Sequence, residues 1–471
     1  MQSTKFQKRL FGTNGVRGVV GKDLTPELVL TIGGALGTMR KGCIAVGRDT
    51  RTSGETLVKA VKSGLLAAGC DVVDCGILPT PALQYLIKEQ FDGGAMITAS
   101  HNPPEYNGVK VIEADGTEMG DEETLKLEQL IFEPSFTPES WKCIGHETHA
   151  PYLTRKYIQA IVHHFPDRVG SEITVVVDPG SGPACITTPR ILTEMGCRVL
   201  TLNGVMDGTF PGRLPEPSSE GLKALADLVV SSGAAFGVAH DGDADRAVFI
   251  DENGRFVEEN REFALIAQHM CRRKKGTLVT PVSTSLVVEM VVKKEGCTIT
   301  YTPVGSIYVA RTMRSLIEEG KEVAFGGEGN GGLIFPDHQF CRDGGMTAAM
   351  MVFILASTGQ QLSTLINALP ERFMIKDKIS TSRGKQVLES LKRVYSQDLP
   401  DLTDGVKIFR NKSWALVRAS GTEPIIRIII DADSYSQGQD FYNELMDHIA
   451  EITHTKVKRY PVSGQSSEEC L

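Results

Sequence analysis

The sequence predicts an α/β protein: three α/β/α domains of one topology with mixed sheets, followed by a smaller C-terminal α+β domain. Apolar strand-like runs alternate with helix-length amphipathic segments to about residue 368, the βαβ pattern of sheets flanked by helices. The dipeptide Gly-Cys also ends a helical segment and opens a strand three times, at residues 69–70, 196–197 and 296–297. A chain of 471 residues is moreover too long for one hydrophobic core.

The segments around each Gly-Cys pair correspond in order, which indicates an internal repeat. A strand is expected upstream of each pair, at 43–46, 173–177 and 277–280, and a second strand downstream, at 95–98, 234–239 and 323–325. Each downstream strand runs into an unusual polar or Gly-rich loop, at the strand end where open α/β sheets bind ligands. The predicted domains are residues 1–150, 151–256, 257–368 and 369–471.

The pattern changes after residue 368. A helix is expected at 385–395, then strands at 406–409, 414–417 and 425–430, then a helix at 438–452. Consecutive strands between two helices predict a small α+β domain.

Composition excludes several classes of partner. The formal charge of −8 and the pI of about 5.8 argue against a nucleic-acid or anionic-membrane partner, because both attract basic surfaces. No run approaches the length of a membrane span, and the N-terminus has no apolar signal region, so we expect a cytoplasmic protein. The ten cysteines are scattered without zinc spacing and are expected to be free thiols.

Ser100 is the first candidate for chemistry. It follows the apolar run 94–97 and precedes Asn102-Pro103, so a buried strand is expected to deliver its hydroxyl to an exposed turn. Ser100 is thus a candidate nucleophile or phosphate carrier. Judged alone, a serine that fills a turn or caps a helix is the better interpretation.

Asp241, Asp243 and Asp245 form a candidate metal cluster directly after a strand. Three carboxylates this close repel one another, and a divalent cation, with magnesium favoured, relieves the repulsion. With Glu252 they match positions 1, 3, 5 and 12 of an EF-hand loop, but Arg246 stands where that loop needs glycine, and the flanks predict a strand entering a hairpin turn. A solvated acidic loop is less favoured, because Arg246 adds a hydrogen-bond donor for phosphate beside the carboxylates.

Three further loops are candidate ligand sites. Residues 11–18 form a Gly-rich loop with Arg17, suited to an oxyanion. Residues 418–424 place Arg418, two hydroxyls and a glycine at a strand end, with Arg427 following, which suits a phosphate dianion. Residues 326–332 carry only Glu328 and Asn330 among five glycines, which suits sugar hydroxyls better than phosphate. Ordinary turns remain the alternative for each loop alone.

As an ordered set, these loops resemble the α-D-phosphohexomutase family over nearly the whole chain. The matching segments are residues 11–18, 98–110, 241–246, 326–332 and 418–427. The resemblance implies three similar α/β domains and a fourth that resembles the TATA-box-binding-protein fold. Two departures from the common pattern resemble archaeal-type phosphoglucosamine mutases. The first is in residues 326–332, here called the sugar loop, where Asn330 stands in place of the Ser of many members. The second is Val304-Gly305-Ser306, which lacks a common His.

The resemblance also implies roles for individual residues. Ser100 would be the phosphoserine that donates and regains the phosphoryl group, and also a metal ligand. Asp241, Asp243 and Asp245 would bind Mg²⁺. Lys110 would be the general acid/base, with His101 as the second candidate; we expect His101 not to activate Ser100 directly, since neighbours in an extended segment point to opposite faces. Arg17 would be a further catalytic residue, which with Arg246 stabilises the phosphoryl group in transit. The remaining residues would bind the phosphoryl group or the substrate: Arg246, Glu328, Asn330, Arg418, Ser420, Gly421, Thr422 and Arg427.

The implied reaction moves phosphate between O6 and O1 of a hexose or hexosamine, through a hexose 1,6-bisphosphate that also serves as activator. The implied partner is a phosphosugar, and the sequence predicts no oligomeric state. A phosphomannomutase or phosphoglucomutase of the same family is the nearer alternative. A non-catalytic sugar-phosphate sensor and a phosphatase acting on the phosphoserine are alternatives of other classes.

Overall fold

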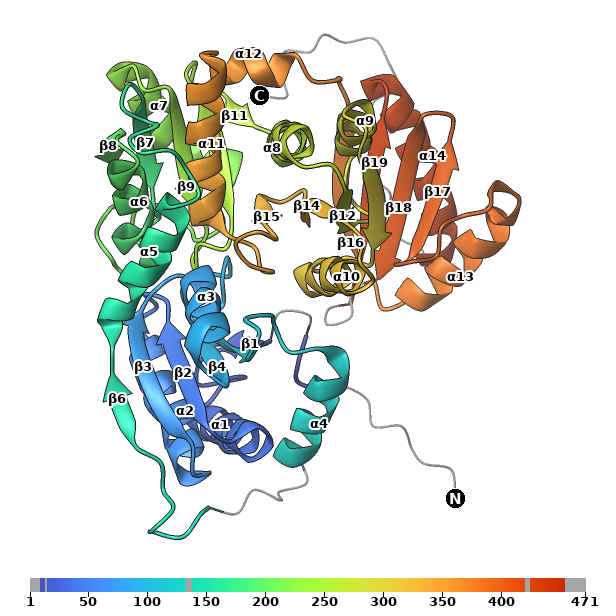
Figure 1. The fold of residues 1–471 in the computed structure, drawn as a ribbon. Coiled ribbons are helices and arrows are strands. Elements are labelled where there is room, and N and C mark those ends of the chain that lie inside the picture. Colours follow the sequence, from blue (N-terminus) through green and yellow to red (C-terminus); the bar gives the residue numbers. More distant parts are fainter. Residues whose placement is uncertain (1–8, 13–14, 133–137, 420–423, 454–471) are drawn as a thin grey trace.

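The computed structural model describes residues 9–12, 15–132, 138–419 and 424–453. Their strands form four sheets, and each sheet with its helices makes one unit. The units lie in an arc, from the first at the lower left of Figure 1 through the second and third to the fourth at the right. Three α/β units followed by an α+β unit were predicted, and this fold class is confirmed.

The first unit contains six strands in the order β1-β5-β4-β2-β3-β6. Its elements are β1 (Val16–Val19), α1 (Pro26–Arg40), β2 (Cys43–Arg48), α2 (Gly54–Ala67), β3 (Asp71–Ile77), α3 (Thr80–Gln90), β4 (Gly93–Ile97), β5 (Tyr106–Glu113), α4 (Asp121–Phe132) and β6 (Glu147–His149).

The second unit contains five strands in the order β11-β10-β9-β7-β8. Its elements are η1 (Pro151–Leu153), α5 (Thr154–Val162), β7 (Thr174–Asp178), η2 (Pro183–Ile186), α6 (Thr188–Glu194), β8 (Arg198–Thr201), η3 (Ser219–Leu222), α7 (Lys223–Ser232), β9 (Phe236–His240), β10 (Ala247–Asp251) and β11 (Phe256–Val257).

The third unit contains four strands in the order β13-β12-β14-β15. Its elements are α8 (Glu259–Arg273), β12 (Thr277–Pro281), α9 (Leu286–Lys294), β13 (Thr298–Thr302), α10 (Ser306–Glu318), β14 (Val323–Glu328), β15 (Gly332–Ile334), α11 (Gly344–Thr358) and α12 (Leu362–Asn367).

The sheets of the first three units share one core of four strands. In each, a strand that ends at a candidate loop (β4, β9 or β14) lies parallel to the first strand of the repeat (β2, β7 or β12), which pairs in turn with the Gly-Cys strand (β3, β8 or β13). An antiparallel strand follows on the other side, β5, β10 or β15. The predicted repeat is therefore confirmed.

The glycine of each Gly-Cys pair has left-handed backbone. The φ angles are +82° at Gly69, +98° at Gly196 and +75° at Gly296. Glycine reaches this region without a steric penalty, which is why it so often follows the last residue of a helix. The glycine thus stops the helix and turns the chain into the next strand.

Helix α11 joins the second and third units. It belongs in sequence to the third unit, yet Figure 1 shows it beside α5, α6 and β9 of the second. Its apolar residues, including Met350 and Val352, share one buried core with Phe165, Ile191 and other residues of the second unit. The two units are therefore packed as one body around α11.

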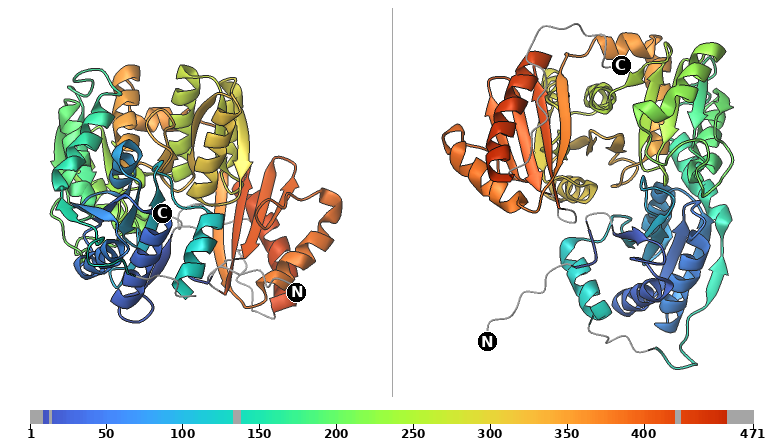
Figure 2. Two further views of the ribbon diagram at one scale, coloured as in Figure 1. Left: turned by 60° about the horizontal axis from the view of Figure 1, so that its bottom comes forward. Right: turned by 180° about the vertical axis from the view of Figure 1, so that it is seen from behind.

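The fourth unit consists of β16 (Phe373–Ser380), α13 (Gly384–Val394), η4 (Ser396–Asp398), β17 (Val406–Arg410), β18 (Ser413–Ala419), β19 (Ile425–Ala432) and α14 (Tyr435–Thr453). Its sheet is antiparallel, in the order β16-β19-β18-β17. The prediction of three strands omitted β16, which pairs with β19 along its whole length. Seen from behind, this unit lies beside the third unit and apart from the second (Figure 2).

Two composition-based expectations can be compared with the described residues. All nine cysteines among them are free, as predicted. No described helix combines the length and apolarity needed to cross a bilayer. The domain boundaries at residues 150, 256 and 368 and the likeness of the fourth unit to the TATA-box-binding protein stay predictions.

Candidate active site

Ser100 lies in the tight turn that follows β4, as predicted. We expected this turn to be exposed, but Ser100 is fully buried in it, and its hydroxyl donates a hydrogen bond of 2.7 Å to Oδ2 of Asp241. Asp241 follows β9 in the second unit, so equivalent strands of two units deliver the two side chains to one point. A serine that only fills a turn would not need a partner 141 residues away.

The backbone at Ser100 is left-handed, with φ of +50°. This region is costly for residues with a Cβ atom and is found where surrounding contacts enforce it. Our expectation that Ser100 and His101 point to opposite faces of an extended segment is therefore wrong. The turn instead places Nδ1 of His101 3.4 Å from the Ser100 hydroxyl oxygen.

Arg51 holds this turn in place. Its buried guanidinium donates to the carbonyl oxygens of Ser100 and Asn102, at 2.7 and 2.6 Å, and to those of Pro103 and Tyr106, at 2.6 and 2.9 Å. Its Nε pairs with Asp49, 3.1 Å away. One side chain thus satisfies four carbonyl groups of the loop that carries Ser100.

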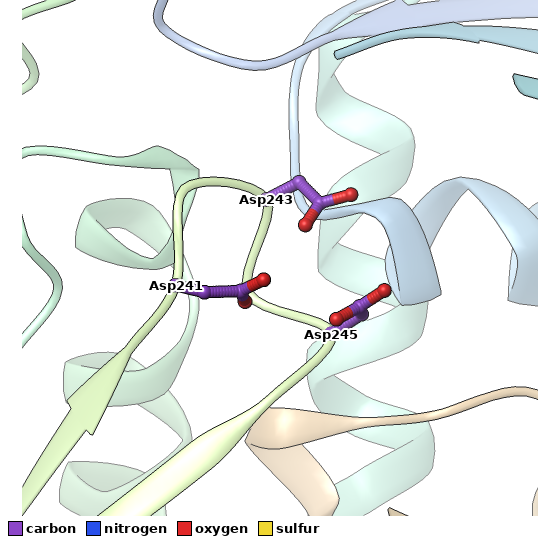
Figure 3. Close-up of side chains that lie close together, drawn as sticks. All are labelled: Asp241, Asp243 and Asp245. Atoms are coloured by element: carbon purple, nitrogen blue, oxygen red, sulfur yellow. The ribbon is translucent and has the colours of Figure 1, made fainter. Parts of the chain in front are cut away.

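The three aspartates converge, as predicted. Each offers a carboxylate oxygen within 4.8 Å of the others, and all three are buried. Figure 3 shows them projecting from one loop into the same space. Oδ1 of Asp243 and Oδ1 of Asp245 are buried without a hydrogen-bond partner.

The electrostatics of the cluster fit a divalent cation. Burial, followed by the charges of Asp245 and Asp243, raises the pKa of Asp241 well above its usual value. Against the effect of burial, Lys110 lowers the pKa of Asp243 and Arg342 lowers the pKa of Asp245, so the negative charge that the neighbours leave unbalanced lies at Asp241. Carboxylate oxygens and one hydroxyl are hard ligands of the kind that Mg²⁺ and Ca²⁺ prefer. The residues present thus fit a bound metal ion.

Close backbone approach lets the two loops meet. A Cβ atom at Gly242 would lie 2.3 Å from the carbonyl oxygen of Ser100, so a side chain there would push the loops apart. Thr80, at the start of α3, donates its hydroxyl to Oδ2 of Asp243 at 2.6 Å and its backbone N–H to the Asp243 carbonyl at 3.0 Å. The first unit therefore anchors the aspartate loop of the second.

Arg246 and His101 lie on the same side of the cluster. The Arg246 guanidinium lies 3.1 Å from Nδ1 of His101 and 3.0 Å from Glu216. Burial, and then the charges of Arg246 and Arg17, lower the pKa of His101 to about 3. His101 is therefore neutral at physiological pH, and its Nδ1 can accept a hydrogen bond from Arg246.

Lys110 reaches the aspartates from β5. Its Nζ donates to Oδ2 of Asp243 at 2.9 Å and to Oδ2 of Asp245 at 3.3 Å. Burial would lower the pKa of Lys110, but the two carboxylates outweigh it and hold the pKa above the usual lysine value. Arg17 completes this side of the site and donates to Oδ1 of Asn102 at 3.0 Å.

The predicted sugar loop is the hairpin between β14 and β15. Glu328 is 6% exposed and accepts a hydrogen bond from Arg342. Asn330 is half-buried, and its Oδ1 accepts from the N–H of Gly332 at 3.2 Å. Arg342 also pairs with Asp245, so the loops of the second and third units are linked.

The arginines predicted to bind a phosphate dianion lie on the fourth unit. Arg418 and Arg427 are cross-strand neighbours on β18 and β19, and the Arg418 guanidinium pairs with Asp404 at 3.0 Å. Nε of Arg418 is buried without a partner. Ser420, Gly421 and Thr422 lie outside the described residues.

Sequence reasoning missed the residues that support these groups. Asp49 and Arg51 occur in Gly47-Arg48-Asp49-Thr50-Arg51, directly after the predicted strand at 43–46, and a charged turn at a strand end was the available signal. Thr80 begins α3 and Glu216 lies in a loop, and neither stands in a distinctive sequence pattern. Arg342 follows a short strand, and nothing in the sequence distinguishes it from a surface arginine.

Comparison with known proteins gives consistent matches. Four family models match in order: the phosphoglucomutase/phosphomannomutase α/β/α domains I, II and III, over residues 8–138, 155–254 and 258–373, and the C-terminal domain, over 375–448. A phosphoglucomutase/phosphomannomutase of Thermococcus kodakarensis is 44% identical over 450 residues, which cover 92% of this chain and 96% of that protein.

A probable phosphoglucosamine mutase of Methanopyrus kandleri is 41% identical, covering 93% of this chain and 97% of that protein. Among solved structures, a phosphoglucomutase/phosphomannomutase family protein of Burkholderia thailandensis matches with a TM-score of 0.83 and 26% identity, covering 93% of this chain and 97% of that one.

Proposed function

This chain belongs to the phosphoglucomutase/phosphomannomutase family of phosphohexomutases, which are isomerases, and we propose that it interconverts the 6-phosphate and the 1-phosphate of a hexosamine. The observation that carries the proposal is the contact between the Ser100 hydroxyl and Asp241 inside the three-aspartate cluster. A phosphoryl group on Ser100 would lie directly against the proposed metal ligands. Glucosamine phosphate is favoured because several relatives, including that of M. kandleri, are named probable phosphoglucosamine mutases.

Ser100 and the aspartates would act together. Asp241, Asp243, Asp245 and an oxygen on Ser100 would hold Mg²⁺, which when bound neutralises charge on the transferring phosphoryl group. Arg246 and Arg17 would add guanidinium donors beside Ser100. Positioned positive charge is the main contribution that a protein makes to phosphoryl transfer.

Lys110 is the better candidate for general acid/base. Its Nζ donates to Asp243 and Asp245, so a sugar hydroxyl that approaches the proposed metal site would come close to it. His101 accepts a hydrogen bond from Arg246 through Nδ1, which suits it to orienting that guanidinium. Replacing His101 by Gln should therefore cost less activity than replacing Lys110 by Met.

Substrate binding would involve all four units. Glu328 and Asn330 would contact sugar hydroxyls, since a carboxylate and an amide can accept and donate to a vicinal pair. Arg418 and Arg427, with Ser420, Gly421 and Thr422, would bind the phosphate distant from the reacting centre. A hexose 1,6-bisphosphate would then be both intermediate and activator, because it can return a phosphoryl group to Ser100 in either orientation.

A phosphoglucomutase/phosphomannomutase activity is the second candidate. The match to the T. kodakarensis protein, at 44% identity, favours it. The reaction and the site would be the same, and only the preferred sugar would differ.

A side-by-side assay tests the proposal. Purified protein with Mg²⁺ and a trace of glucose 1,6-bisphosphate is given glucosamine, glucose and mannose 6-phosphates in separate reactions. We expect a 1-phosphate product, fastest from glucosamine 6-phosphate, and an intact mass that shows one phosphoryl group. Ser100→Ala should abolish both. A faster reaction of glucose or mannose 6-phosphate would favour the second candidate, and no product from any of the three would refute a mutase.

A further inference from the structure

Arg342 is a buried arginine that joins two candidate loops. Its side chain is 4% exposed. One terminal nitrogen donates to Oε2 of Glu328 at 2.9 Å, and the other donates to Oδ2 of Asp245 at 2.5 Å. The sugar loop of the third unit and the aspartate loop of the second are therefore held by one guanidinium.

The surrounding backbone leaves space for this side chain. A Cβ atom at Gly332 would lie 2.3 Å from Cδ of Arg342, so the absence of a side chain at Gly332 lets Arg342 pass across β15. Arg342 also forms a β-bridge with Ile334. These contacts bring the guanidinium beneath the sugar loop.

The residue after Arg342 fixes its backbone. Asp343 caps α11 by accepting from the N–H of Met346 at 2.9 Å, and it also accepts from the Tyr157 hydroxyl at 2.6 Å. Tyr157 belongs to α5 of the second unit. Arg342 therefore projects from a segment anchored on both units that it connects.

Only an arginine can make both contacts at once. The guanidinium presents parallel donors in a rigid fork, whereas a lysine ammonium is a single point charge. Without Arg342, Glu328 would be a buried carboxylate that lacks its ion-pair partner, which is a costly state. The carboxylate would then turn toward water, and this movement would alter the acceptor that it offers to a ligand.

We propose that Arg342 is a positioning residue for sugar recognition, which holds the Glu328 carboxylate oriented toward the sugar hydroxyls at a fixed distance from the aspartate loop. This inference rests on the proposed function, in which Glu328 contacts the sugar. Arg342 acts through Glu328 and Asp245 and does not itself touch the reacting atoms.

A double-mutant cycle tests whether Arg342 acts through Glu328. Because a hydrogen bond to a charged group is worth about 1.5–3 kcal/mol, Arg342→Met and Glu328→Gln should each lower kcat/KM by about 10- to 100-fold. The double variant should be no worse than the poorer single variant by more than about 3-fold, since coupled residues are not additive. Arg342→Lys should recover part of the loss. Independent, multiplicative losses would overturn the inference.

Hydrogen exchange separates this inference from the proposed function. In the protein without substrate, Arg342→Met should raise amide exchange in residues 326–332 by at least about 10-fold, because loss of the ion pair releases the sugar loop. Arg272→Met serves as the control, since Arg272 pairs with Glu295 on an exposed face. Unchanged exchange in Arg342→Met would overturn the positioning role whatever the substrate, whereas a wild-type protein without mutase activity would refute the proposed function.

Discussion

The Ser100 hydroxyl and the Asp241 carboxylate meet at 2.7 Å, although they belong to different units and lie 141 residues apart. Both are buried, and each follows the equivalent strand of its own unit. The repeat therefore explains the site: one topology used twice places two strand ends face to face. A metal ion held at Asp241 would also contact whatever oxygen Ser100 presents.

Mg²⁺ should stabilise the folded protein, because it would bind the native cluster and not the unfolded chain. At 100 times its dissociation constant a ligand adds about 2.7 kcal/mol to the free energy of unfolding. Thermal unfolding with Mg²⁺ and with EDTA measures the effect. Asp243→Asn should lose the Mg²⁺-dependent shift, whereas Asp227→Asn, on the exposed surface of α7, should keep it. An equal shift in both variants would contradict a metal site at the cluster.

Replacing Arg51 should damage both stability and the Ser100 loop. Arg51→Met leaves four carbonyl groups without their donor and Asp49 buried without its counter-charge. Breaking a buried pair costs about 3–5 kcal/mol. Removing the charge at Asp49 as well, by Asp49→Asn in the Arg51→Met background, should recover part of the stability but not the phosphorylation of Ser100.

Thermal unfolding and intact mass after treatment with glucose 1,6-bisphosphate check this prediction. Arg190→Met, which removes an exposed pair with Glu194 on α6, is the control and should change neither. If Arg51→Met phosphorylates Ser100 at the wild-type rate, the guanidinium does not position the loop.

Much of this arrangement could be predicted from sequence, because its signals are local. Apolar runs, the three Gly-Cys pairs and the spacing of Asp241, Asp243 and Asp245 report strand ends and a charged loop without reference to distant residues. The β16 strand was missed, since Lys376, Asp377 and Lys378 interrupt its apolar pattern. β16 is a strand because it pairs with β19. Since β19 is remote in sequence, the local pattern around β16 does not show this pairing.

The supporting residues could not be predicted, because their roles exist only across units. Arg51 is identified by the four carbonyl groups that it reaches, and Arg342 by two carboxylates from separate loops. The left-handed backbone at Ser100 depends on such contacts, and expecting an extended segment there placed His101 on the wrong side. Local pattern thus finds the proposed reacting groups, whereas tertiary packing decides how they face one another.

Lys407 should make the stability of the fourth unit depend on pH. It lies 3% exposed against the third unit, where its Nζ donates to the Val282 carbonyl at 2.6 Å and lies 4.1 Å from the Trp414 ring centre. Burial lowers its pKa from 10.5 to about 8, although Asp401, Asp431 and Glu289 oppose this change. Between these two values the unfolded chain binds the proton and the folded one does not. Stability therefore rises with pH in that window and is unaffected below it.

Denaturant unfolding of wild type and Lys407→Met checks this. A tenfold difference in proton affinity between the folded and the unfolded chain corresponds to about 1.4 kcal/mol, so wild type should gain about 1–3 kcal/mol relative to the variant between pH 8 and 10. Fluorescence follows the transition, because Trp414 is fully buried and Trp141 is 81% exposed. A constant difference across the window would mean that Lys407 keeps its ordinary pKa.

Asp404 should tune phosphate affinity through Arg418. Its Oδ2 accepts from the backbone N–H of Val304 in the third unit at 2.9 Å and pairs with the Arg418 guanidinium at 3.0 Å. The Asp404 carboxylate therefore orients Arg418, the proposed hydrogen-bond donor to the phosphate, and ties the fourth unit to the third.

Asp404→Ala should raise KM for the phosphosugar by about 3- to 10-fold, the equivalent of one hydrogen bond of about 0.5–1.5 kcal/mol, with little change in kcat. The KM of Asp404→Asn should fall between those of wild type and Asp404→Ala. Its amide oxygen can still accept from the N–H of Val304, while the charge on Arg418 is no longer balanced. Asp398→Ala, at an exposed position of the same unit, is the control. Steady-state kinetics separate the two constants, and a loss confined to kcat would contradict a role of Asp404 in binding the phosphate.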